Sequence, residues 1–272
     1  SKLTCSATAT DPDGGTPNKT YEWFVNAGAT TVGTGSVLQL SNTLVSPGDA
    51  VACKITAEDD DGGTDSNSTT ITVRNSIPTI GSASVTPSIV YNNSSISCLA
   101  SGNDQDDGTL SATYGWTNTT TSSTLGTGTS LTLTSTTATP TDTIRCTATV
   151  TDSAGASVST TRDITVGNRS PQVSAVTVTP STAITTSTTL SCAASGSDID
   201  NDGTTWSYAW SYTDPATSST GSLSSTGNPY ELVLTPTSVQ PGWKITCKAT
   251  IEDDHGATDD MTVLLCCQHL CT

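Results

Sequence analysis

Acidic side chains recur at matching places in three stretches of this chain. They are Asp11, Asp13 and Asp59 in the first stretch, Asp104, Asp106 and Asp152 in the second, and Asp198, Asp200 and Asp253 in the third. Carboxylates held close together repel one another, which either raises their pKa values or favours a bound cation. Ca²⁺ takes about six to eight oxygen ligands in flexible geometry, whereas Zn²⁺ prefers His or Cys. The pattern therefore indicates calcium as the chemistry to look for.

A cysteine, a tryptophan and a second cysteine recur with the same spacing in each stretch. The tryptophan follows the first cysteine by 18 residues and precedes the second by 30, 30 and 37. The three sets are Cys5, Trp23 and Cys53; Cys98, Trp116 and Cys146; and Cys192, Trp210 and Cys247. The first cysteines lie 93 and 94 residues apart, a period that suits a small domain with its own core rather than a solenoid repeat. The chain is thus predicted to hold three tandem copies of one domain.

The composition favours an all-β fold. Ser and Thr dominate, and the aliphatic residues alternate with polar ones, as in residues 131–134 and 176–178. Period-two alternation puts the apolar side chains on one buried face of a strand, and no stretch shows sustained helical periodicity. We expect half-buried antiparallel strands throughout.

The Cys–Trp–Cys pattern resembles that of immunoglobulin-like β-sandwiches, in which the tryptophan packs on a disulfide between the two sheets. Antibody-type domains place a Tyr two residues before the second cysteine, but Val51, Ile144 and Ile245 stand there. The Asp-x-Asp loops and the Val-x-Asn-x-x-Pro junctions look more like bacterial surface immunoglobulin-like repeats or polycystic-kidney-disease repeats. The resemblance implies disulfides Cys5–Cys53, Cys98–Cys146 and Cys192–Cys247. It also places strand B at residues 3–10, C at 20–26, F at 50–57 and G at 68–74.

Short proline-containing links separate the copies and predict an extended rod. Asn75 to Pro78 and Asn168 to Pro171 each follow a predicted strand G, where proline stops strand pairing. We expect domains at residues 1–75, 76–168 and 169–272. Only four residues precede Cys5, so the first domain is expected to lack strand A here. Its open edge either accepts a strand from another chain or is completed by residues upstream of this segment.

In the immunoglobulin topology the B–C and F–G loops meet at one end of a domain, beside the incoming link. The resemblance therefore implies that the aspartates converge there and that calcium stiffens the junctions. The expected metal ligands are Asp11, Asp13, Asp59 and Asp60; Asn75, Asp104, Asp106 and Asp152; and Asn168, Asp198, Asp200 and Asp253. The alternative is that these loops are solvated turns, in which Asp and Gly are favoured for local hydrogen bonding.

Charge and composition argue against several classes of function. A net charge of -16 repels nucleic acid and anionic membranes, and no apolar run is long enough to span a bilayer. His255 and His269 are the only imidazoles and belong to no recognisable nucleophile motif, so no enzymatic activity is expected. Paired cysteines in β-domains indicate an oxidising, extracellular or cell-surface setting.

Several residues fall outside the repeat pattern. Trp206 and Trp243 occur only in the third copy, where they either bind a ligand, or cover a longer loop or pack at a domain contact. Cys266, Cys267 and Cys271 in the tail are candidates for disulfides between subunits. Asn-x-Ser/Thr sequons that permit glycosylation begin at Asn18, Asn67, Asn92, Asn93, Asn118 and Asn168.

Two functions fit these features. The first is a structural subunit of an extracellular fibre, which assembles head to tail with copies of itself, with structural Ca²⁺ at its junctions. The second is an adhesin stalk whose third domain recognises a glycan or a protein. The two differ in whether the open edge of the first domain and the unusual C-terminal strand meet in another copy.

Overall fold

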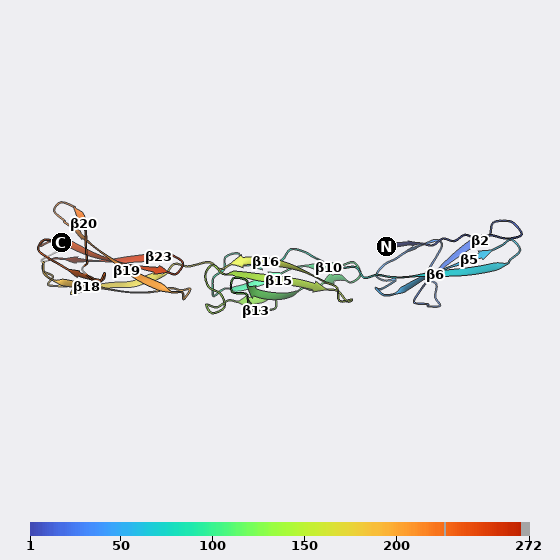
Figure 1. Cartoon of the computed structure of the whole chain (residues 1–272), viewed down its shortest axis with the longest axis horizontal. Coiled ribbons are helices and arrows are strands. Elements are labelled where there is room, and N and C mark those ends of the chain that lie inside the picture. Colours follow the sequence, from blue (N-terminus) through green and yellow to red (C-terminus); the bar gives the residue numbers. More distant parts are fainter. Residues whose placement is uncertain (226, 268–272) are drawn as a thin grey trace.

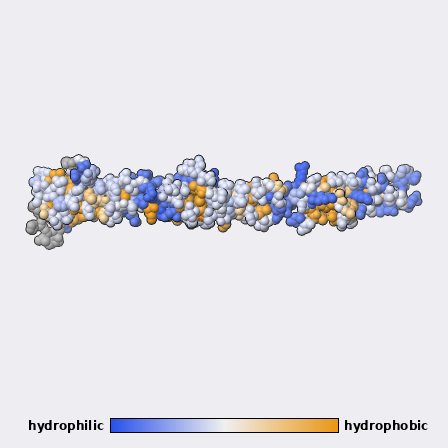
Figure 2. Space-filling view, turned by 90° about the horizontal axis from the view of Figure 1, so that it is seen from below, coloured by the Kyte–Doolittle hydropathy of each residue, from blue (hydrophilic) through white to orange (hydrophobic). Residues whose placement is uncertain are grey.

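The chain folds as three β-sandwiches in a row. The computed structural model describes residues 1–225 and 227–267, and the regular elements in these residues are all strands. The three sandwiches follow one another along an extended rod, and most long strands run roughly along its axis (Figure 1). The face seen in Figure 2 is mostly hydrophilic or neutral, with small separate hydrophobic patches. The fold is therefore the all-β tandem array that the sequence predicts.

The first domain has a four-stranded sheet facing a two-stranded one. The larger sheet has the order β3-β2-β5-β6 and the smaller one pairs β1 with β4. Their bounds are β1 Lys2–Thr4, β2 Asn18–Val25, β3 Gly33–Thr34, β4 Val37–Gln39, β5 Ala50–Glu58 and β6 Thr64–Thr72.

The second domain repeats this plan with an extra strand, β8, beside the counterpart of β1 and with a third, small sheet. Its sheets have the orders β13-β12-β15-β16, β14-β9-β8 and β11-β10-β7. The bounds are β7 Thr79–Ile80, β8 Ser84–Thr86, β9 Ser95–Leu99, β10 Gly102–Asp104, β11 Gly108–Leu110, β12 Thr113–Asn118, β13 Ser123–Thr127, β14 Ser130–Thr132, β15 Thr143–Thr151 and β16 Ser157–Thr165.

The third domain has sheets of order β20-β19-β22-β23 and β17-β18-β21. The long strand β17 pairs with β18 and also lies against β23, so it joins the two sheets. The bounds are β17 Gln172–Thr179, β18 Thr189–Ser197, β19 Thr204–Thr213, β20 Thr220–Leu223, β21 Glu231–Val233, β22 Lys244–Asp253 and β23 Thr258–Cys266.

Each domain is centred on a disulfide packed beside a tryptophan. The bonds Cys5–Cys53, Cys98–Cys146 and Cys192–Cys247 join the two facing sheets. Each tryptophan belongs to the same buried cluster as its disulfide, and its indole N–H donates to a backbone carbonyl of Gly35, Gly128 or Pro229. A buried indole thus keeps a hydrogen-bond partner while its ring fills the core.

Two strand limits in the first domain differ from those expected from the sequence. The strand expected over residues 3–10 ends at Thr4, whereas the matching segment of the second domain continues as β10, which pairs with β7. The strand expected over residues 68–74 starts earlier, at Thr64. There the β5–β6 hairpin closes through a short turn in which Gly62 has φ of 86°, so Glu58 pairs with Thr64.

The residue four positions before the second cysteine distinguishes the third domain from the other two. In the first domain Asn26 Nδ2 donates to Asp49 Oδ1 at 2.6 Å, and Asn118 makes the same bond to Asp142 in the second. Trp243 replaces this aspartate in the third domain and stacks on Tyr212 with ring centroids 4.3 Å apart. An aromatic stack thus takes the place of a polar pair.

The polar pair makes the first domain sensitive to acid at this position. The backbone N–H of Ser46 and the Asn26 amide hold the pKa of Asp49 below its ordinary value. The stabilisation from this pair is therefore complete above the ordinary pKa and is lost as the pH falls through the lowered one. We expect Asn26→Ala to raise the pKa of Asp49 toward its ordinary value, as followed by NMR of the side-chain carboxyl. An unchanged titration would contradict this explanation.

Candidate functional site at the domain junctions

The two junctions between domains are built on one plan. Asn75 Nδ2 donates to Asp152 Oδ2 at 2.8 Å, and Asn168 Nδ2 donates to Asp253 Oδ2 at 2.8 Å. The next backbone N–H donates to the Asp-x-Asp loop, from Ser76 to Asp106 and from Arg169 to Asp200. The structure therefore brings each link together with both loops that the sequence analysis assigned to it.

Within these loops one oxygen of several aspartates fixes its own turn. Asp104 Oδ1 accepts the N–H groups of Asp106 and Asp107 at 2.7 and 3.0 Å. Asp152 Oδ1 accepts the N–H of Ala156 at 2.8 Å, and Asp253 Oδ1 accepts that of Ala257 at 2.8 Å. These bonds are those of the solvated-turn alternative.

The remaining oxygens of the junctions are not explained by turns. Five buried side-chain polar atoms in the described residues lack a hydrogen-bond partner, and all five are oxygens at the two junctions. They are Asn75 Oδ1, Asp104 Oδ2, Asn168 Oδ1, Asp198 Oδ2 and Asp202 Oδ1. Leaving such an atom unpaired costs about 1–3 kcal/mol. A hard cation would satisfy oxygens of this kind, because its ligands are carboxylates and amide carbonyls.

Burial and local hydrogen bonds set the charge state of these groups. Asp104, Asp152, Asp200 and Asp253 are all buried. Burial raises the pKa of Asp198, and the neighbouring carboxylates of Asp202 and Asp200 add to that rise. The Asn75 amide lowers the pKa of Asp152. Burial alone would raise the pKa of Asp253, but hydrogen bonds from Asn168 and backbone N–H groups outweigh it and lower the pKa.

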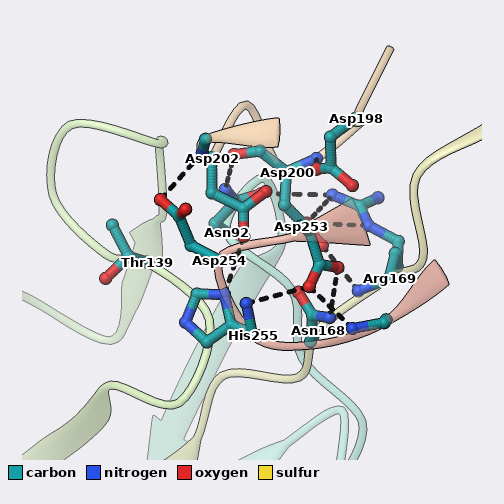
Figure 3. A network of polar contacts seen from close by, with 12 residues as sticks. Asn92, Thr139, Asn168, Arg169, Asp198, Asp200, Asp202, Asp253, Asp254 and His255 are labelled. Atoms are coloured by element: carbon teal, nitrogen blue, oxygen red, sulfur yellow. Dashed lines mark hydrogen bonds and ion pairs between the residues drawn. The ribbon is translucent and has the colours of Figure 1, made fainter. Parts of the chain in front are cut away.

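The second junction contains groups that the sequence analysis did not assign to it (Figure 3). Asp202 Oδ2 lies 2.7 Å from His255 Nδ1, and Arg169 forms an ion pair with Asp200. Asn92, from the second domain, donates its amide to the backbone carbonyl of Asp200. Asp202 follows the first cysteine of its copy by 10 residues, where the other copies have Gly15 and Gly108, so alignment of the repeats gives it no acidic counterpart.

The predicted ligands of the first domain lie away from any junction of this chain. Asp11 Oδ1 accepts the N–H of Asp13 at 3.0 Å, and Asp59 Oδ1 accepts that of Gly63 at 2.7 Å. A Cβ placed on Gly15 would lie 3.7 Å from Asp11 Oδ2 and 4.0 Å from Asp60 Oδ2, so these two carboxylates face the same space.

Residues 1–225 and 227–267 contain no group of three or more His, Cys, Asp or Glu side chains arranged to hold a metal ion. A cation at a junction would therefore depend on the asparagine carbonyls and on backbone or water oxygens as well as carboxylates. In the same residues no helix is long and apolar enough to cross a membrane.

The aromatic residues particular to the third domain pack within it. Trp243 is partly buried against Tyr212, and Trp206 stacks on Tyr208 with centroids 6.4 Å apart. Gly196 leaves room for Trp206, since a Cβ there would lie 3.2 Å from its ring. These ring contacts lie inside the third domain rather than at a contact between domains.

The tail cysteines differ in their surroundings. Cys267 is a buried free thiol in the third core, and burial raises its pKa, so in the folded domain it is not placed to bond a second chain. Cys266 has a partner of its own. Cys271 and His269 lie outside the described residues.

The sequons separate by exposure. Asn18, Asn67 and Asn93 are exposed. Asn92 and Asn118 are 2% and 1% exposed, and their amide nitrogens donate hydrogen bonds inside the fold. Asn168 uses its amide nitrogen on Asp253. A glycan on any of these last three would replace a structural hydrogen bond.

These features define a tandem array of three disulfide-bonded β-sandwiches with acidic junctions. No protein-family model and no curated protein matches the sequence. Among solved structures, the three N-terminal domains of the bacteriophage RB49 highly immunogenic outer capsid protein are 13% identical with a TM-score of 0.30, covering 99% of this chain and 93% of that one.

A Ca²⁺-stabilized adhesin that helps an Antarctic bacterium bind ice is 17% identical with a TM-score of 0.39, covering 96% of this chain and 67% of that one. Extracellular cadherin domains 3–6 of protocadherin gamma B2 are 13% identical with a TM-score of 0.34, covering 92% of this chain and 65% of that one. None of these similarities assigns the chain to a family.

The asparagine of each link is expected to control the charge of the carboxylate it contacts. Asn75→Ala removes the hydrogen bond that most lowers the pKa of Asp152, so this pKa should rise toward its ordinary value. Amide exchange at Ser76 and Ile77 should also become faster, because the link loses an anchor. Both are measured by NMR. Gln105→Ala, at an exposed position of the neighbouring loop, is the matched control and should change neither quantity.

Proposed function

We propose that the chain is a rigid spacer of an extracellular structural protein, stiffened at its junctions by calcium. The observation that carries this proposal is the set of five buried, unpartnered oxygens, all of which lie where one domain meets the next. A cation bound there would offset both the carboxylate repulsion and the lost hydrogen bonds. We place the domain boundaries at 75/76 and 168/169, within the links that these oxygens surround.

The proposed ligands come from both sides of each boundary. At the first junction they are Asn75, Asp104, Asp106 and Asp152, and at the second Asn168, Asp198, Asp202 and Asp253. Because the asparagines belong to the link and the aspartates to the following domain, the ion would fix the direction in which the chain enters that domain. The three disulfides support an oxidising, extracellular location.

Calcium is expected to raise the melting temperature of the chain relative to the same chain in a chelator. An ion at a hundred times its Kd adds about 2.7 kcal/mol. Each kcal/mol raises the Tm of a domain of this size by roughly 4–8 °C. Asp104→Asn should remove the part of the shift that belongs to the second domain, as seen by calorimetry. Asp65→Asn, on the exposed strand β6, is the control. An identical Tm with calcium and with chelator would rule the proposal out.

Head-to-tail assembly is a second part of the proposal, and a groove in the first domain favours it. The groove has a volume of about 560 Å³ and lies between residues 7–12 and strands β5 and β6. In the second domain β7 occupies the matching place beside β10 and contacts β15 and β16. All nine residues of β6 are exposed. A strand of another copy would pair here by β-augmentation.

Sedimentation of the chain at increasing concentration is expected to show linear oligomers. A synthetic peptide of residues 75–86, which contains β7 and β8, should compete for the groove and return the chain to monomers. A peptide with the same composition in scrambled order is the control. Monomers at every concentration would contradict assembly through this groove and leave the calcium proposal untouched.

A further inference from the structure

The two junctions differ at the residue after the asparagine, which is Ser76 in the first and Arg169 in the second. The backbones of these two residues make equivalent hydrogen bonds. The Ser76 N–H donates to Asp106 Oδ2 at 2.7 Å, and the Arg169 N–H donates to Asp200 Oδ2 at 2.6 Å. Only the second junction therefore has a permanent positive charge at this point of the link.

The Arg169 guanidinium bonds to both domains that it lies between. Its Nε is 2.9 Å from Asp200 Oδ1, and its Nη2 contacts the same oxygen and lies 3.1 Å from Asn92 Oδ1. The guanidinium carbon also sits 4.7 Å from the centroid of the Tyr91 ring. Tyr91 and Asn92 belong to the second domain and Asp200 to the third, so one side chain bridges the boundary (Figure 3).

This bridge is shielded from water. The side chain of Asp200 is fully buried and that of Arg169 is 22% exposed. Asn92 completes the contact, because its amide donates to the Asp200 backbone carbonyl while its own oxygen accepts from Arg169. Charge-assisted hydrogen bonds in such surroundings are stronger than those at an exposed surface.

The first junction has no comparable bridge. In the described part of the chain, no hydrogen bond or ion pair connects residues 1–74 directly to residues 77–168, and the contacts run only through Asn75 and Ser76. Asp106 Oδ1, the counterpart of the oxygen that Arg169 occupies, accepts no hydrogen bond. The serine is too short to reach across the boundary.

We infer that Arg169 is a built-in cation that keeps the second and third domains aligned without a metal ion, whereas the joint at Asn75 is aligned only when a divalent cation is bound. The second half of this inference rests on the proposed calcium function, and the first half does not. The rod then has one permanent joint and one joint whose stiffness follows the calcium concentration.

The inference also makes the two calcium sites unequal. Arg169 neutralises Asp200 and occupies the oxygen whose counterpart remains open in Asp106. Asp200 is therefore withheld from the ion, and a positive charge lies beside the ligands of the second junction. Arg169→Ser should loosen the second joint in chelator and, by releasing Asp200 Oδ1, raise its calcium association constant about tenfold, since affinity follows the charge of the ligand set. Isothermal titration measures the second effect.

Pulsed electron spin resonance on the full chain tests the mechanical part. Spin labels carried by encoded amino acids at exposed positions 70, 161 and 262 report the first joint as the pair 70/161 and the second as 161/262. In chelator we expect a narrow distance distribution for 161/262 and a broad one for 70/161, and calcium should narrow the latter. Arg169→Ser should broaden 161/262 in chelator, and calcium should narrow it again.

Arg162→Ser is the matched control, because it removes the same charge from an exposed position on β16. A broad 161/262 distribution in the unchanged chain in chelator, or no effect of Arg169→Ser, would overturn the role of Arg169. If 161/262 behaves as expected but 70/161 ignores calcium, the arginine bridge stands and the calcium function fails.

Discussion

Everything in this chain depends on the contact between a buried tryptophan and a disulfide that joins two sheets. The repeat period is only 93 or 94 residues and each domain has a small buried cluster, so the cross-link and the indole hold the two sheets together. The loops at the ends of the sandwich inherit their positions from this core. Acidic loops can then be placed against a link with the same geometry twice, as the matching bonds of Asn75 and Asn168 show.

At the junctions, oxygen acceptors and carboxylates outnumber the hydrogen-bond donors and positive charges that face them. The side-chain nitrogens of Asn75 and Asn168 each donate a hydrogen bond to a carboxylate, while their side-chain carbonyl oxygens are buried without a donor. The Arg169 side chain donates to part of this excess of acceptors at the second junction, whereas at the first junction only the backbone N–H of Ser76 donates. A single difference between two otherwise similar links thus changes how the charge of the neighbouring loop is compensated.

The sequence predicted the class of fold through alternation and a spacing that is repeated three times. It predicted the meeting of loops and links through the topology that the immunoglobulin-like resemblance implies. It could not reveal Asp202, Asn92 or Arg169 as parts of the junction. Asp202 stands where the other two copies have glycine. Asn92 precedes a strand at the opposite end of the second domain from Asp104. Neither therefore has a repeated signal. The role of Trp243 was ambiguous for a related reason. Its partner Tyr212 lies on another strand, and the two rings stack only because the fold sets those strands side by side.

The separation of 48 residues between Cys98 and Cys146 has a consequence for how the rod responds to tension. The second domain lies between the other two along the rod, so a pulling force enters it through one link and leaves through the other, at the opposite end (Figure 1). If the sheets separate, the force passes through the disulfide and not through the residues that it encloses. Only about half of the domain can then extend, to a length of roughly 15 nm. The disulfide of each domain therefore limits how far that domain can extend under force, and a reducing agent would remove the limit.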